Sequence, residues 1–200
     1  MVYVPLRALE QEDEPVLEEA LVELNDVAES EPKFFRKHYK DIFGAFMKIL
    51  EKNDYTNSTL RHQPVEFLTT VGERIPTILE KDDELLKNLL DVIFKIMIDI
   101  DEEIDVTWLR PKEGFRIDED EEDEDDVSFG KSCIDRLVAS LGDEKMLPLL
   151  SILVQNTLAN DQDWRFKHAG LMALSQVGEY IEDAEKIAPM VPTIIAHLTH

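Results

Sequence analysis

The sequence contains few of the residues that form covalent cross-links or sharp turns. Its one cysteine, Cys133, excludes an intramolecular disulfide and a cysteine-rich metal site, which agrees with an intracellular protein. Seven glycines and nine prolines among 200 residues are too few for a fold of many short strands and turns. Leucine, glutamate, lysine and alanine, which favour helices, occur throughout. We therefore predict an all-α fold.

Long apolar runs and catalytic motifs are also absent. No apolar run approaches the ~20 residues of a membrane-spanning helix. The first residues lack the basic and apolar regions of a signal peptide, so we expect a soluble, unsecreted protein without membrane insertion. The five histidines have no partners at the spacings of metal sites or catalytic triads, and nucleotide-binding and hydrolase motifs are missing. The sequence predicts neither enzymatic activity nor a cofactor or metal.

Positive charge is scarce, because 21 lysines and arginines stand against 44 aspartates and glutamates, for a net charge of −23. Nine acidic residues follow one another: Asp118, Glu119, Asp120, Glu121, Glu122, Asp123, Glu124, Asp125 and Asp126. Such a charge repels nucleic acid and anionic lipid, and it attracts cationic surfaces at rates that fall with salt. We expect basic proteins or peptides as partners and no direct nucleic-acid binding. The alternative is that the acidic residues only keep the protein in solution.

The sequence also contains an internal repeat. Residues 166–181 (FKHAGLMALSQVGEYI) and 60–75 (LRHQPVEFLTTVGERI) are identical at six of sixteen positions. Weaker copies cover residues 16–31 and 130–145. Self-similarity of this kind is typical of a solenoid, in which each helical unit buries its apolar face against its neighbours. We therefore expect a single array over the whole chain rather than separate globular domains.

The helical periodicity suggests four helix pairs within residues 1–200. We place the repeat helices approximately at 16–50, 60–100, 130–158 and 164–198. The interval between the second and third copies exceeds the ~40–47 residues of a HEAT or armadillo unit. The surplus, residues 101–127, contains the acidic run, and a dense run of like charges resists packing. We predict a disordered acidic loop inserted into the array.

One segment resembles a known family. Residues 164–175 read WRFKHAGLMALS, and they follow CIDR at 133–136 and the dipeptide LP at 147–148. Together with the repeat and the acidic run, this segment is similar to the importin-beta superfamily of nuclear transport receptors. Within the superfamily it most resembles the karyopherin-beta-3 (importin-5) type. The resemblance covers residues 118–182 well and the earlier repeats only in pattern, and we expect the chain to be an internal fragment.

The resemblance implies HEAT repeats in a right-handed superhelix, without enzymatic activity. It further implies import of basic cargo that carries nuclear localisation segments, contact with nucleoporins and the Ran GTPase, and shuttling between cytoplasm and nucleus. The acidic run at 118–126 is the segment expected to bind cargo or Ran. The alternative function is a HEAT-repeat scaffold that assembles a protein complex, in which the acidic loop is dispensable.

Two glutamates outside the loop are further candidates for binding. Glu73 and Glu179 occupy the same position in two repeat copies, on the helix side opposite the packed apolar stripe. Thr69 is expected on that side as well. If this side lines the concave surface, as the resemblance implies, both glutamates bind lysine or arginine of a ligand. Otherwise they are solvated surface residues.

The repeat alignment and the turn between two repeat helices predict structural roles for three more residues. His62 and His168 share a repeat position, which favours a packing or surface role over ligand binding. Arg165 is expected to pair with Asp161 or Asp163 across the turn. None of the three is expected to contact a ligand.

Overall fold

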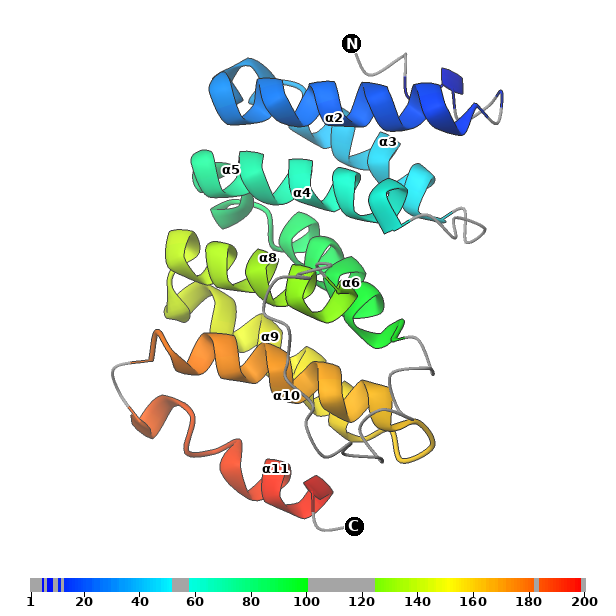
Figure 1. Cartoon of the computed structure of the whole chain (residues 1–200). Coiled ribbons are helices and arrows are strands. Elements are labelled where there is room, and N and C mark those ends of the chain that lie inside the picture. The colour runs from blue at the N-terminus through cyan, green and yellow to red at the C-terminus, as the bar shows by residue number, and fades with distance from the viewer. Residues whose placement is uncertain are drawn as a thin grey trace, which may run out of the picture.

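The computed structural model of the chain is a stack of helices (Figure 1). It describes residues 5, 7, 8, 11, 13–51, 58–100, 125–181 and 184–198. The longer helices are α2 (Glu14–Ser30), α3 (Tyr39–Glu51), α4 (Ser58–Arg74), α6 (Asp83–Ile98), α8 (Asp126–Leu141), α9 (Asp143–Leu158), α10 (Trp164–Gly178) and α11 (Val191–Leu198). The shorter ones are η1 (Pro32–Phe35), α5 (Thr77–Glu80) and η2 (Ala184–Lys186). The described residues include no strand, and the all-α prediction is confirmed.

The helices form two layers. In Figure 1, α2, α4, α8 and α10 follow one another down the stack in chain order, and α3, α6 and α9 lie behind them. Each helix of the first layer contacts the next, while α6 with α8 and α9 with α10 make the main contacts between layers. This arrangement confirms the predicted HEAT-repeat solenoid. The division into four particular units stays a prediction.

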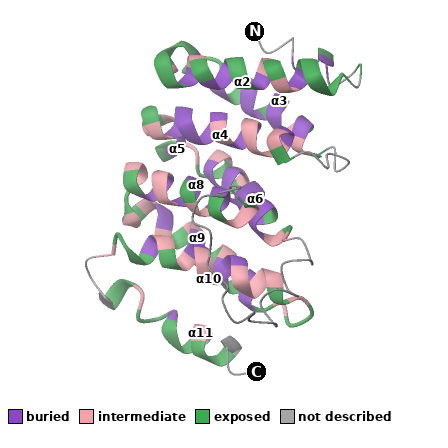
Figure 2. Ribbon diagram, in the orientation of Figure 1, coloured by how far each residue is buried: buried purple, intermediate pink, exposed green. Residues whose placement is uncertain are grey.

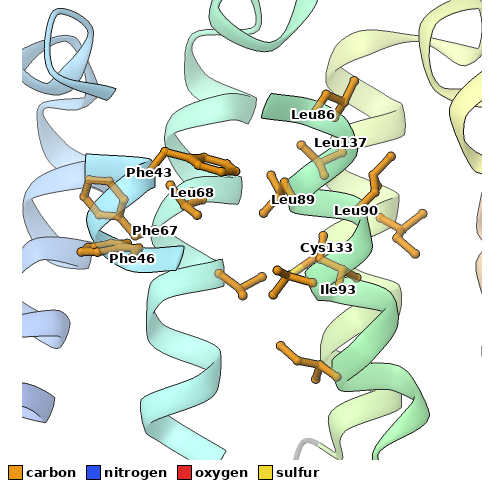
Figure 3. Close-up of a cluster of buried hydrophobic side chains, with 14 of the residues drawn as sticks. Phe43, Phe46, Phe67, Leu68, Leu86, Leu89, Leu90, Ile93, Cys133 and Leu137 are labelled. Carbon is orange, nitrogen blue, oxygen red and sulfur yellow. The ribbon is translucent and has the colours of Figure 1, made fainter. Parts of the chain in front are cut away.

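The apolar core runs between the layers along the stack, where Figure 2 shows the buried residues. Figure 3 shows how one part of it is filled. Phe46 of α3 and Phe67 of α4 lie close together, and Leu137 of α8 lies near Leu86 of α6. Cys133 is buried among the same apolar side chains. The helices from α2 to α10 thus bury apolar side chains against neighbouring helices, as a solenoid requires.

Aspartates stabilise the N-termini of four helices. Asp13, Asp82, Asp125 and Asp163 each accept a hydrogen bond from a backbone N–H in the first turn of α2, α6, α8 and α10. A cap of this kind stabilises a helix by about 1 kcal/mol. Part of the chain's acidity therefore serves the termini of its helices.

Helix α8 begins before the predicted end of the acidic loop. Residues 101–124, including seven of the nine acidic residues, lie outside the described part of the chain. Asp125 and Asp126 belong to α8, as its N-cap and its first residue. The prediction that the loop extends to residue 127 was wrong, because a helix N-terminus favours carboxylates through its free N–H groups and its dipole.

The hydroxyl of Tyr39 connects α3 to α4. It is buried and donates a hydrogen bond of 2.9 Å to the carbonyl oxygen of Leu68. Burial raises the pKa of Tyr39 well above its usual range, because a phenolate there would lose its hydration. We expect Tyr39→Phe to lower the free energy of unfolding by about 1 kcal/mol in urea denaturation.

Because the pKa of Tyr39 is raised in the folded state, the free energy of unfolding should depend on pH. Its contribution is complete below the unfolded-state pKa of about 10 and is lost as the pH rises above that value. The wild type should therefore lose stability above about pH 10 more steeply than Tyr39→Phe. Tyr180→Phe is the comparison: a hydrogen bond to Asp135 also raises the pKa of Tyr180, but this side chain is exposed, so its removal should change the slope less. Equal slopes for all three proteins would contradict the prediction.

Candidate ligand-binding surface

The candidate residues that the structure describes lie on or beside the first layer of helices. Glu73 is in the last turn of α4, Asp126 begins α8, and Glu179 follows the end of α10. The helix α8 lies between α4 and α10 (Figure 1) and contacts both. The structure therefore places Glu73 and Glu179 on helices separated by α8.

The carboxylate of Asp126 connects α8 to α4. Its two oxygens lie 2.7 Å from Nη2 of Arg61 and 2.6 Å from Nε2 of His62. The ring of His62 stacks on Phe129, with centroids 4.0 Å apart and an angle of 8° between the planes. Arg61 also pairs with Asp99 at the end of α6. Asp126 thus takes part in contacts inside the array, and His62 has the packing role expected from its repeat position.

Arg136 of α8 binds two glutamates of α4. Its Nη1 donates to Oε1 and Oε2 of Glu66, at 2.7 and 2.9 Å, and its Nε donates to Oε2 of Glu73 at 2.8 Å. Its Nη2 donates to the hydroxyl of Thr70 at 2.7 Å, and that hydroxyl donates to Glu66 at 2.8 Å. We call these four residues, Arg136, Glu66, Thr70 and Glu73, the arginine clamp.

The charges of the arginine clamp do not cancel. Burial lowers the pKa of Arg136, but hydrogen bonds and charge from Glu66 and Glu73 outweigh it and raise the pKa overall. The guanidinium stays charged, so two carboxylates face one cation and one negative charge remains. Oε1 of Glu73 has no hydrogen-bond partner among the described residues, and the Glu73 side chain is 30% exposed. Glu73 therefore retains some capacity for a further cation.

Glu179 differs from Glu73 in its surroundings. It is exposed, and its carboxylate has no ion pair within the described residues. The next residue, Tyr180, donates a hydrogen bond of 2.8 Å to Asp135 of α8, which fixes the end of α10 against its neighbour. Of the two predicted glutamates, Glu179 is the more accessible to a ligand.

The clamp is the feature that the sequence patterns did not reveal. Glu66, Thr70 and Glu73 recur at helical spacing and therefore share one side of α4. Their partner Arg136 is 63 residues beyond Glu73 in the chain, and no local pattern joins them. Thr69, expected on the same side, is fully buried. That expectation was wrong because α4 packs against α2, α6 and α8, which widens its buried side.

Residues around the start of α10 have the structural roles expected of them. Arg165 pairs with Asp163, Nη2 to Oδ2 at 2.8 Å, as predicted. His168 packs edge-on to Trp164, with ring centroids 5.9 Å apart. Burial lowers the pKa of His168, which favours the neutral ring at pH 7. Trp164 itself is half exposed.

Two features are absent from the part of the chain that the structure covers. Within it, no three metal-ligating side chains come together in a group. No described helix has the length and apolar character needed to cross a bilayer.

The two layers of stacked helices define the chain as a HEAT-repeat solenoid. Residues 53–148 match the family model of the importin repeat. The chain is similar to the crystal structure of Kap121p bound to Pho4p, with a TM-score of 0.79, 21% identity and 98% of this chain covered. Kap121p bound to RanGTP matches with a TM-score of 0.76 and 22% identity, and Kap121p bound to Nup53p with 0.76 and 23%, each over 96% of this chain.

The chain spans only 18% of the length of each of these Kap121p chains. At such identities the structural likeness establishes the fold. The importin-repeat match adds sequence similarity over the central part of the array. The chain is therefore similar to importin-repeat proteins over residues 53–148, and it has the fold of the matched part of Kap121p.

Proposed function

We propose that the chain is a segment of a nuclear transport receptor, of the karyopherin-beta-3 (importin-5) type, that binds basic cargo during import through the nuclear pore. The observation that carries the proposal is the importin-repeat match at 53–148, because this range includes the whole acidic run. Kap121p has been crystallised with RanGTP, with Nup53p and with Pho4p. By extension we propose cargo, Ran and nucleoporins as partners, and shuttling between cytoplasm and nucleus.

In this proposal the acidic run and the carboxylates of the first layer recognise lysine and arginine side chains. Seven acidic residues at 118–124 attract a basic segment over roughly one Debye length, about 8 Å at physiological ionic strength. Glu179 and the free oxygen of Glu73 then offer short-range partners. Each exposed pair contributes about 0.2–1 kcal/mol, so several pairs must act together to give useful affinity.

A peptide titration tests the acidic run. The probe is a fluorescein-labelled peptide of alternating lysine and serine, measured by anisotropy at low and physiological salt. The variant replaces residues 118–124 with serine and glycine and keeps Asp125 and Asp126, because these two cap and anchor α8. We expect affinity to fall about tenfold or more in the variant, and wild-type affinity to fall as salt rises.

A second pair of substitutions tests the two glutamates. Glu73→Gln with Glu179→Gln removes two charges from the first layer. The matched control, Glu51→Gln with Asp91→Asn, removes two from α3 and α6 of the other layer. Weaker peptide binding by the Glu73→Gln, Glu179→Gln variant alone supports binding by the first layer. An equal loss of affinity in the control variant would mean that net charge alone is responsible. Absence of binding by wild type and all variants would contradict the import function and favour a HEAT-repeat scaffold.

A further inference from the structure

In the arginine clamp, the guanidinium of Arg136 lies where the cationic group of a ligand would have to lie to contact Glu66 and Glu73. Arg136 makes four hydrogen bonds to Glu66, Glu73 and Thr70, and Thr70 is itself only 2% exposed. The two carboxylates and the hydroxyl therefore form a fitted set of acceptors around a planar cation. That cation comes from the neighbouring helix α8, on the far side of the insertion from α4.

The arginine clamp is partly exposed to solvent. The side chains of Arg136, Glu66 and Glu73 are 26, 28 and 30% exposed, so water and a ligand reach all three. Ion pairs with this exposure are screened, and each contributes little to stability. The remaining negative charge attracts a second cation, which can replace Arg136 at Glu73 while Arg136 keeps its two bonds to Glu66.

We propose that Arg136 is an internal competitor: a lysine or arginine of a basic peptide can meet the free Oε1 of Glu73, but it binds both carboxylate oxygens only after Arg136 has released Oε2. The proposal rests on the function proposed above. According to this proposal, Arg136 lowers the affinity of the protein for peptides with few cationic side chains. Peptides with several cationic side chains are therefore preferred. The net negative charge of the chain and Glu179 attract such ligands first, and exchange at Glu73 follows.

The test compares peptide affinity in wild type and Arg136→Gln, with the lysine–serine peptide and anisotropy. If Arg136 competes, Arg136→Gln binds the peptide about fivefold more tightly, the equivalent of about 1 kcal/mol. Glu73→Gln added to Arg136→Gln should abolish the gain. If Arg136 instead orients Glu73 for the ligand, Arg136→Gln binds more weakly or without change, and the proposal is overturned.

Arg61→Gln is the matched control, because it also removes one positive charge and two ion pairs of α4, one with Asp126 of α8 and one with Asp99 at the end of α6. An equal gain in Arg61→Gln would mean that net charge alone is responsible, which overturns the proposal. Circular dichroism establishes folding of each variant. If Arg136→Gln does not fold, Arg136→Lys replaces it in the test. The lysine ammonium cannot bridge both glutamates as the guanidinium does, so we expect a smaller gain in peptide affinity, of about twofold.

The same data separate this proposal from the proposed function. Peptide binding by wild type that is unchanged in Arg136→Gln overturns the competition and leaves the import function standing. Absence of peptide binding by wild type, Arg136→Gln and Arg136→Lys overturns both.

Discussion

Phe67→Ala should lower the free energy of unfolding of the array by about 3–5 kcal/mol. Phe67 is fully buried in α4, and its ring meets Phe35 and Phe46 edge-on, with centroids 4.8 and 5.0 Å apart. Removing the ring loses the transfer free energy of the phenyl group and both aromatic contacts, and it leaves a cavity. The free energy of unfolding of a native domain is about 5–15 kcal/mol, so this one substitution should remove a large share of it.

The expected loss is also local. In a solenoid each unit contacts only its neighbours, so damage at α4 affects α2 and α3 before α9 and α10. Urea denaturation measures the change in the free energy of unfolding, and hydrogen exchange followed by mass spectrometry locates it. Exchange should accelerate in α2, α3 and α4 and stay near wild type in α9 and α10. Uniform acceleration over all described helices would show that the array unfolds as one unit.

Phe34 provides a control of the same residue type. It lies one position before Phe35 and touches that ring, with centroids 5.3 Å apart, but it is 60% exposed. Phe34→Ala leaves no buried cavity, so we expect a change within about 0.5 kcal/mol. A loss in Phe34→Ala equal to that in Phe67→Ala would mean that burial does not govern the cost.

The architecture could be predicted from the sequence because its causes are local and repeated. Apolar residues at helical spacing define each helix, and the recurrence of Leu68, Val71 and Gly72 at 174, 177 and 178 indicates stacking of similar units. The structure buries both Leu68 and Val71 completely. Local pattern therefore predicts the apolar residues that face the core, although it does not predict the burial of Thr69, which depends on how neighbouring helices pack.

The candidate surface could be predicted only in part, because ion pairs join residues far apart in the chain. The acidic character of Asp126 and Glu73 was evident, but their partners Arg61 and Arg136 depend on how α8 packs on α4. The end of the acidic run illustrates the same difficulty. An aspartate in a run of like charges and an aspartate that caps a helix look alike until the helix after it is known, as with Asp125.

Gly170→Ala should destabilise the contact between α9 and α10 by about 1–3 kcal/mol, although alanine is the better helix former. A Cβ at position 170 would lie 2.4 Å from Oγ1 of Thr157 and 3.4 Å from its Cβ. Thr157 is buried and donates a hydrogen bond of 2.9 Å to Val154. Its branched side chain has few rotamers in a helix, so it cannot move aside without losing that bond or separating the helices.

Two further variants decide whether close packing is the cause. Gly178 lies in the same helix with no atom within 4 Å of a Cβ added there, so Gly178→Ala should leave stability unchanged or raise it. Thr157→Ala combined with Gly170→Ala removes the hydroxyl that the new methyl group meets. A double-mutant cycle in urea should then give a favourable coupling of about 1 kcal/mol or more between the two substitutions. Additive losses would mean that Gly170 is required for a reason other than its distance from Thr157.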